Sequence, residues 1–274
     1  MTVPLFNPDS SLVAEVIPSP NFGERVADRL PDMLLLHYTG MPESQGALEW
    51  ICSPNSKVSA HYYVFEDGRI VQCVPEALRA WHAGESFWAN DTDINSCSIG
   101  IEIANPGHDH KYPDFPARQI AAVTALCRSI VKRRLIPAER VLAHSDVAPG
   151  RKKDPGEKFP WHILHHSGVG YWVEPLPIVP GPDFTIGDRG DVIASFQVLL
   201  AEYGYRVPTE GAFDEATRDA VEAFQRHFRP ERVDGVVDSS TLMTLQALID
   251  SRASKPRQAP AKPGILLDED LFRP

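Results

Sequence analysis

Three residues of metal-ligand type lie far apart in the sequence. His37 occurs in LLLHYTG, and His144 and Asp154 occur in AHSDVAPGRKKDPG. Each follows an apolar run or borders a Gly/Pro-rich turn, so we expect each where a strand or loop opens onto a cleft. Two imidazoles and one carboxylate leave the fourth position of a tetrahedral Zn²⁺ site open, which suits hydrolysis better than structural binding. The chain has ten histidines, so this triple needs support from its neighbours.

Two further side chains are candidates for chemistry at such a centre. In SIGIEIAN the isoleucines alternate with Ser98, Gly100 and Glu102, which places Glu102 on the strand face away from the isoleucines. A carboxylate there is either solvated or the general base that takes a proton from water. Lys152 lies two residues before Asp154, so it is either a solvated loop lysine or a partner for a developing oxyanion.

Other histidines compete as ligands. His61 in SAHYY and His82 in RAWHAG both adjoin small residues, so either could enter a cleft. The motif WHILHH places three histidines at helical spacing, which resembles a metal pair. No general base or carboxylate accompanies that motif, so we favour the separated triple.

The elements that must position these residues are strands interleaved with helices. MLLLHY is a short apolar run typical of a buried strand, and AHYYVFEDGRIVQCV predicts a hairpin that turns at Asp67-Gly68. FPARQIAAVTALCRSIVKRRL has apolar residues at helical spacing and predicts one long helix. This pattern predicts an α/β domain, a mixed central sheet flanked by helices.

Composition divides the chain into four parts. Residues 1–172 hold the candidate site, residues 173–184 are a Pro-rich linker, residues 185–251 form a second unit, and residues 252–274 are a flexible tail. In the second unit, GAFDEAT and GVVDSST place Asp214 and Asp238 at helix N-caps. Apolar residues at helical spacing lie around them, so this unit is expected to be a small all-α three-helix bundle.

The overall charge and the terminal sequence bear on partners and location. Lys and Arg number 27 against 37 Asp and Glu, a net charge of −10, which argues against a nucleic-acid partner. No apolar run is long enough for an integral membrane segment. The N-terminus does not read as a secretory signal, so a cytoplasmic location is expected if Met1 is the natural start, and a periplasmic one if a leader is missing. The four cysteines are expected to be reduced thiols, with two disulfides as the alternative.

Five ordered motifs resemble a known family. LLLHYTG, SAHYYVFEDGRIVQCV, RAWHAG, SIGIEIAN and AHSDVAPGRKKDPGEKFPW are similar to the type-2 N-acetylmuramoyl-L-alanine amidases, the AmpD and AmiD group. The resemblance implies a mixed sheet with helices on its faces, a fold shared with peptidoglycan-recognition proteins. It also implies zinc on His37, His144 and Asp154, a catalytic Glu102, and an assisting Lys152. Residues 185–251 similarly resemble the peptidoglycan-binding domain found beside cell-wall hydrolases.

The resemblance implies hydrolysis of the amide between the lactyl group of N-acetylmuramic acid and L-alanine. The substrate would be peptidoglycan or a soluble anhydro-muropeptide, in wall turnover or recycling. Adjacency to the motifs suggests five substrate contacts, with plain core packing as the alternative for Trp81: Tyr62, Arg79, Trp81, His82 and Asn105. Two other functions stay open, namely a non-catalytic peptidoglycan-recognition protein and a zinc peptidase that cuts within the stem peptide.

Overall fold

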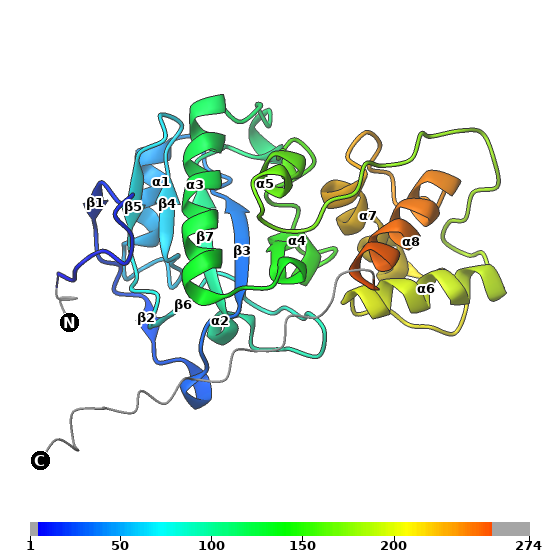
Figure 1. Ribbon diagram of the computed structural model, residues 1–274, viewed down its shortest axis with the longest axis horizontal. Coiled ribbons are helices and arrows are strands. Elements are labelled where there is room, and N and C mark those ends of the chain that lie inside the picture. Colours follow the sequence, from blue (N-terminus) through cyan, green and yellow to red (C-terminus); the bar gives the residue numbers. More distant parts are fainter. Residues whose placement is uncertain (1–4, 254–274) are drawn as a thin grey trace, which may run out of the picture.

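A six-stranded mixed sheet forms the centre of the first unit in the computed structural model, which describes residues 5–253 (Figure 1). The sheet order is β1-β5-β4-β7-β3-β8. Its strands are β1 (Glu15–Val16), β3 (Met33–Tyr38), β4 (Tyr62–Val64), β5 (Ile70–Gln72), β7 (Ser98–Ile103) and β8 (Val141–Ala143). β4 and β5 form the predicted antiparallel hairpin, with Gly68 at φ +88° in its turn, whereas β7 pairs in parallel with both β3 and β4. The predicted mixed sheet is thus confirmed.

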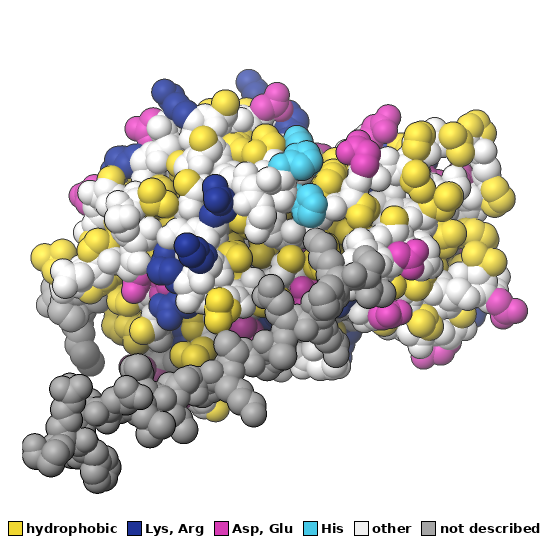
Figure 2. All heavy atoms as spheres, in the orientation of Figure 1, with side chains coloured by type: hydrophobic (Ala, Val, Ile, Leu, Met, Phe, Trp, Pro, Cys, Tyr) yellow, Lys and Arg dark blue, Asp and Glu magenta, His cyan; other side chains and the backbone are white. Residues whose placement is uncertain are grey.

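The two faces of the central strands are used differently. On one face Ile99, Ile101 and Ile103 of β7 pack in a buried cluster with α3 (Ala117–Arg134), the long helix that crosses the sheet in Figure 1. Alternation then places Glu102 on the other face, as the sequence predicts. Figure 2 shows several basic side chains over α3, on its solvent side. Glu102 lines the cleft, so the cleft opens on the face of the sheet that α3 does not cover.

Shorter elements surround this sheet. β2 (Phe22–Gly23) and β6 (Arg79–Ala80) form a separate antiparallel pair. The short helices of the first unit are η1 (Val26–Asp28), α1 (Ser44–Ile51), α2 (Ile94–Cys97), η2 (His108–His110), η3 (Ala138–Arg140), α4 (His144–Val147) and α5 (Trp161–His166). The four cysteines, all in the described part of the chain, are free thiols. Within residues 5–253 no helix combines the length and the apolar character needed to cross a bilayer.

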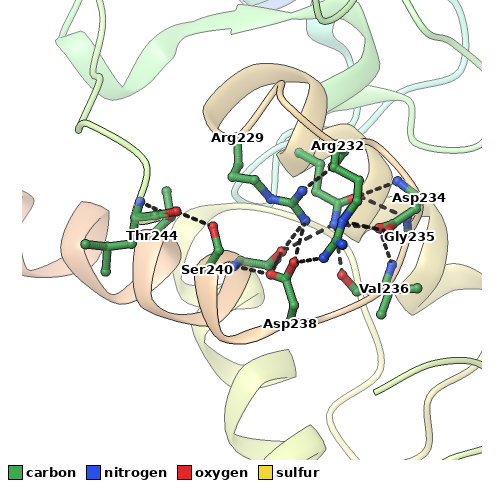
Figure 3. Close-up of polar contacts among 11 residues, drawn as sticks. Arg229, Arg232, Asp234, Gly235, Val236, Asp238, Ser240 and Thr244 are labelled. Carbon is green, nitrogen blue, oxygen red and sulfur yellow. Dashed lines mark hydrogen bonds and ion pairs between the residues drawn. The ribbon is translucent and has the colours of Figure 1, made fainter. Parts of the chain in front are cut away.

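The second unit contains three helices, as predicted: α6 (Asp191–Tyr203), α7 (Glu215–Phe228) and α8 (Ser239–Ala253). α7 and α8 begin by the same device, because the side chains of Asp214 and Asp238 accept the backbone N–H groups of Thr217 and Thr241 at 2.8 and 2.7 Å. Arg229 also points at Asp238, with 3.4 Å between their charged groups (Figure 3). The contacts of Asp214 fix the start of α7, and those of Asp238 fix the turn between α7 and α8.

The two units pack closely against each other. Residues 173–184 have no helix or strand, and their Leu176 is bound to α8 at both Ser240 and Thr244. Leu142 and Val147 of the first unit share one buried apolar cluster with α6, α7 and α8. The division of the sequence into four parts stays a prediction. Residues 252 and 253 of the predicted tail belong to α8, and the rest of the tail lies outside the described residues.

Candidate active site

The three predicted metal ligands come together from three separate elements. His37 is on β3, His144 is the first residue of α4 directly after β8, and Asp154 lies in the loop that follows α4. Because β3 and β8 are neighbours in the sheet, their ends bring the two histidines together. His37 Nδ1 lies 2.9 Å from His144 Nδ1 and 3.1 Å from Asp154 Oδ2, and His144 Nδ1 lies 2.9 Å from the same oxygen. All three residues are buried.

The hydrogen bonds behind His37 determine which of its ring nitrogens carries the proton. Ser98 donates its one hydroxyl proton to the carbonyl of Ile94 at 2.6 Å, so its Oγ accepts from His82 Nε2 at 3.2 Å. His82 Nδ1 is then an acceptor, and it receives the Nε2 proton of His37 at 3.1 Å. His37 Nδ1 therefore directs a lone pair towards the other two ligands.

His144 is oriented in the same way by a backbone carbonyl. Its Nε2 lies 3.0 Å from the carbonyl oxygen of Ala83, which can only accept, so Nε2 carries the proton and Nδ1 the lone pair. Two imidazole lone pairs and the oxygen of Asp154 thus face one another with no donor between them. Such a set of acceptors fits a cation. Ligand atoms about 3.4 Å apart are expected around tetrahedral zinc, so the three atoms need to separate by only a few tenths of an ångström.

The pKa shifts of two of these residues favour the forms that bind a metal. Burial, and then the neighbouring His144, lower the pKa of His37 to about 4, so that ring is neutral at pH 7. Burial opposes ionisation of Asp154, but His144 and His37 outweigh it and hold the pKa of Asp154 below its ordinary value. A neutral His37 and an ionised Asp154 are the forms that bind divalent metals. The three residues could hold such an ion.

Glu102 and Lys152 lie beside this cluster. Glu102 is directly opposite His37 in the parallel β3–β7 pair, so both side chains point to the same face. Its Oε2 is buried and has no hydrogen-bond partner among the described residues. Burial, and then the negative charge of Asp154, raise the pKa of Glu102 well above its ordinary value, while the positive charge of Lys152 opposes that rise. A carboxylate with a free buried oxygen and raised proton affinity can act as a general base near neutral pH.

A cleft of about 410 Å³ surrounds these residues. Its lining includes the metal cluster, Glu102 and three consecutive basic side chains, Arg151, Lys152 and Lys153. Arg151 is held in place because its Nη2 donates to the carbonyl groups of Ala83 and Glu85 at 2.6 and 2.5 Å. The rim therefore carries positive charge in a chain whose net charge is −10, which favours an anionic group on the ligand.

Four of the five predicted substrate contacts, Tyr62, Arg79, Trp81 and Asn105, do not line this cleft. Tyr62 is fully buried with its hydroxyl donating to Glu76 at 2.6 Å, because β4 turns it towards the α3 side of the sheet. The guanidinium of Arg79 is 2.9 Å from Asp93, so it already has a carboxylate partner within the chain. Trp81 is half-buried and also lies outside the lining. Tyr62 and Arg79 thus already have partners within the fold.

Asn105, the fourth residue outside the lining, and His82 also have partners within the fold. Asn105 is buried, and its side-chain amide donates to the carbonyl of Pro113 at 2.9 Å and so ties down a loop. His82 does line the cleft, but both its ring nitrogens are engaged, one by His37. The structure thus places His82 behind His37, the predicted metal ligand, in a position to orient its ring.

The competing histidines do not join the cluster. His61 is fully buried; its Nδ1 accepts from the backbone N–H of Gly100 at 3.0 Å, and its Nε2 lies 3.0 Å from the carbonyl of Leu78. The histidines of WHILHH lie on α5, where Figure 2 shows histidines at the surface. Among the described residues, the His37, His144 and Asp154 group is the one set of three that could hold a metal ion.

Several lining residues were not predicted. Tyr38 and Thr39 follow His37 directly, and adjacency to a ligand is a signal that could have found them. His108 carries no such signal: it reaches the cleft from η2, where its ring bonds Tyr38 at 2.9 Å and Glu157 at 3.0 Å. These three partners are separated by long stretches of sequence, and no spacing rule links them.

Comparison with known proteins relates this architecture to a family. The family profile described as N-acetylmuramoyl-L-alanine amidase matches residues 27–157, and the one described as putative peptidoglycan binding domain matches residues 189–245. The chain is 36% identical to N-acetylmuramoyl-L-alanine amidase AmiD of Escherichia coli K12 over 234 residues, which cover 80% of this chain and 82% of the relative. It is 35% identical to 1,6-anhydro-N-acetylmuramyl-L-alanine amidase AmpD of Citrobacter freundii over 56% of this chain and 90% of the relative.

A solved structure agrees with both units. It is a complex of E. coli AmiD with anhydro-N-acetylmuramic acid-L-Ala-D-γ-Glu-L-Lys; it superposes with a TM-score of 0.71 at 32% identity and covers 86% of this chain and 99% of the other. The similarity to AmiD in sequence and in fold thus extends over most of the chain and includes both units. From this shared sequence and fold, the chain belongs to the N-acetylmuramoyl-L-alanine amidase family.

Proposed function

We propose that the protein is a zinc-dependent hydrolase that cleaves the amide between the lactyl group of N-acetylmuramic acid and the L-alanine of the stem peptide. The observation that carries the proposal is the meeting of three metal-ligand acceptors with a buried, unpartnered carboxylate oxygen of Glu102 in one cleft. A structural metal site would have no need of a free base beside it. An open metal site with a base is the arrangement that hydrolysis requires.

His37, His144 and Asp154 would hold the zinc ion. When bound, zinc acts as a Lewis acid that polarises a carbonyl group and lowers the pKa of water. Glu102 takes a proton from the attacking water molecule as the oxygen of that water bonds to the amide carbon. It then passes that proton to the nitrogen as the carbon–nitrogen bond breaks, so the products are a muramic acid carboxylate and a peptide with a free L-alanine amine.

Lys152 is proposed to stabilise the oxygen of the amide carbonyl as it becomes negatively charged. Two observations support this role: Lys152 lines the cleft, and its charge acts on Glu102. Its backbone N–H is bonded to the carbonyl of Ala148 at 3.0 Å, which fixes where the side chain starts. A positive charge in a water-poor cleft is worth far more to a developing oxyanion than the same charge in solvent.

The substrate class follows from the rim and from the relatives. Arg151 and Lys153 present positive charge to groups entering the cleft, and stem peptides carry carboxylates. One relative is named for its action on 1,6-anhydro-N-acetylmuramyl-L-alanine, and AmiD was solved with an anhydro-muramoyl tripeptide. We propose that soluble anhydro-muropeptides are substrates, and that polymeric peptidoglycan is a further candidate.

The same reasoning assigns roles along the chain. Residues 1–172 would be the catalytic unit, 173–184 the linker and 185–251 the peptidoglycan-binding unit. The profile match over residues 189–245 supports the last assignment. A wall-binding unit favours a polymer, whereas the bound fragment in the AmiD complex favours soluble pieces, so both substrates belong in the test.

The test is to load the purified chain with zinc and incubate it separately with anhydro-muramoyl tripeptide and with intact sacculi. Mass spectrometry should detect a released peptide that begins with L-alanine, from at least one substrate. Glu102→Gln, which keeps the shape of the side chain, should bind zinc equally well and release about 10²-fold less product or lower. Zinc uptake without any cleavage would identify a non-catalytic recognition protein, and cleavage within the stem peptide would identify a peptidase.

A further inference from the structure

The second helical unit reaches the metal site through one buried carboxylate, Asp146. Asp146 is the third residue of α4, whose first residue is the ligand His144, and it is fully buried. Its Oδ2 accepts the backbone N–H of Ala143 at 2.8 Å, back across the start of the helix. This bond is the reach-back half of a capping box, and it fixes the turn from β8 into α4. The direction in which His144 points depends on that turn.

The other hydrogen bonds to Asp146 come from beyond the linker. The hydroxyl of Tyr205, just after α6, donates to Oδ1 at 2.6 Å. Nδ1 of His227, on α7, donates to Oδ2 at 2.6 Å. Both residues are buried, and the ring of His227 stacks on Trp161 with 3.8 Å between ring centroids. Two residues of the second unit therefore satisfy a carboxylate that belongs to the first.

The same contact region extends to the rest of the ligand loop. The backbone N–H of Ser145 donates to the carbonyl of Asp154 at 3.0 Å, so α4 is bonded to the third ligand as well. At Gly150, where φ is +72°, a Cβ atom would lie only 2.1 Å from the carboxylate of Asp219 on α7. That close approach requires glycine at this position, and it shows that α7 packs directly against the loop that leads to Lys152. The second unit thus contacts the segment that carries two ligands and the proposed oxyanion partner.

Loss of these contacts has a definite consequence for the site. A fully buried carboxylate that loses its donors is strongly unfavourable, so Asp146 would turn towards solvent or towards other donors. Its bond to Ala143 would then be lost, and the first turn of α4 would no longer be held. His144 would lose its fixed direction even though its own partner, the carbonyl of Ala83, is unchanged.

We propose that Tyr205 and His227 are positioning residues of the metal site, which hold His144 in its ligating direction through Asp146. The inference rests on the proposed function in that His144 is taken as a zinc ligand. It adds a role for the second unit that binding to the wall does not require. Deleting that unit would then damage the metal site itself, and not only attachment to a polymer.

The experiment uses the full chain with Tyr205→Phe and His227→Phe, singly and together, because phenylalanine keeps the rings and removes the donors. His227→Asn restores a donor near the position of Nδ1. Arg218→Ala, on the same helix but paired with Asp219, is the matched control. Zinc affinity is measured by competition with a chromophoric chelator, and the cobalt-substituted proteins are compared by their visible absorption spectra.

The double variant should bind zinc about tenfold more weakly or worse, as is typical when groups that orient a ligand are lost. Its cobalt spectrum should change, kcat should fall with KM nearly constant, and binding to sacculi should persist. His227→Asn and Arg218→Ala should stay within about threefold of the unaltered chain. If the double variant does not fold, Tyr205→Phe alone, which removes one hydroxyl, should still weaken zinc binding measurably.

Unaltered zinc affinity and an unaltered cobalt spectrum in a folded double variant would overturn the inference. So would weakening by Arg218→Ala as large as that by the double variant, since this would indicate general destabilisation. Zinc uptake by the unaltered chain without cleavage of any muramoyl peptide would refute the proposed function alone. The affinities of the variants would still decide the positioning role in that case.

Discussion

Replacing His82 by leucine should weaken metal binding although His82 is not a ligand. His82 Nδ1 is the acceptor for the Nε2 proton of His37 at 3.1 Å, and both rings are buried. Leucine fills much of the same space but cannot accept that proton. In the metal-free variant, the proton of His37 can move to Nδ1 and donate to Asp154, 3.1 Å away. Metal binding must then return the proton to Nε2, where it has no partner.

The cost of that return sets the size of the effect. A buried N–H group without an acceptor costs about 1–3 kcal/mol. Each 1.4 kcal/mol is a factor of ten in an equilibrium constant, so the zinc dissociation constant should rise by roughly 5- to 150-fold. This range agrees with the losses of metal affinity, roughly 10- to 100-fold, that follow when the hydrogen-bond partners of ligating histidines are removed.

The assay is chelator competition at pH 7, with circular dichroism to verify that the variants are folded. His82→Asn is the matched control, because its Oδ1 can accept a hydrogen bond close to the position of Nδ1. We expect His82→Asn to stay within about fivefold of the unaltered chain. A folded His82→Leu variant with unchanged affinity would refute the assignment of protons on His37, and equal losses in both variants would refute the role of the acceptor.

Three further predictions address other parts of the site and fold. Lys152→Met should lower kcat about 10²-fold with zinc retained, whereas the exposed neighbour change Lys153→Met should alter kcat by less than about threefold, as measured on a muramoyl tripeptide. Gly100→Ala should weaken zinc binding about tenfold in chelator competition and cost roughly 1–3 kcal/mol of stability in urea unfolding, because the new Cβ would lie 2.6 Å from the His82 ring. Gly46→Ala, whose Cβ would meet nothing closer than 3.7 Å, should have neither effect. His61 should make the metal-free protein sensitive to acid, because burial and then Arg25 lower the pKa of His61 to about 3, whereas in the unfolded chain it is near 6.5, so protons bind the unfolded chain first. Between pH 7 and pH 5, urea unfolding with a chelator present should show a loss of unfolding free energy about 2 kcal/mol larger than in His61→Asn. An equal loss in both proteins would be the contrary result.

The sequence predicted those features that local pattern determines. The alternation of isoleucines in β7 indicated the face of Glu102, and the run of apolar residues at helical spacing indicated α3. Asp214 and Asp238 indicated two helix starts, because a capping side chain acts within three residues of itself. In each case the interaction that stabilises the element lies within the same short segment whose pattern predicts it.

The residues around the ligands could not be predicted in this way. Tyr62 adjoins a motif, but the short β4 strand turns it to the α3 side of the sheet, where Glu76 accepts its hydroxyl. His82 was predicted as a substrate contact, and it does line the cleft; its bond to His37 is a further contact that position in a motif does not reveal. The bond between Asp146 and His227 spans 81 residues and two units, so no periodicity within either unit reveals it.

The charge balance of the site shows how Glu102 could act as the proposed base so close to the proposed metal ligand Asp154. Without a cation, the negative charge of Asp154 acts together with burial to raise the pKa of Glu102, so the proton of Glu102 is held tightly. A divalent ion held at Asp154 would reverse the sign of the nearby charge and, with Lys152, would favour the ionised form of Glu102. Burial still keeps the proton affinity of Glu102 above that of a solvated carboxylate. In the proposed mechanism, the two opposing effects would leave Glu102 ionised enough to accept a proton and basic enough to retain it until the amine leaves. This balance would require the proposed metal ligands and the proposed base to share one cleft.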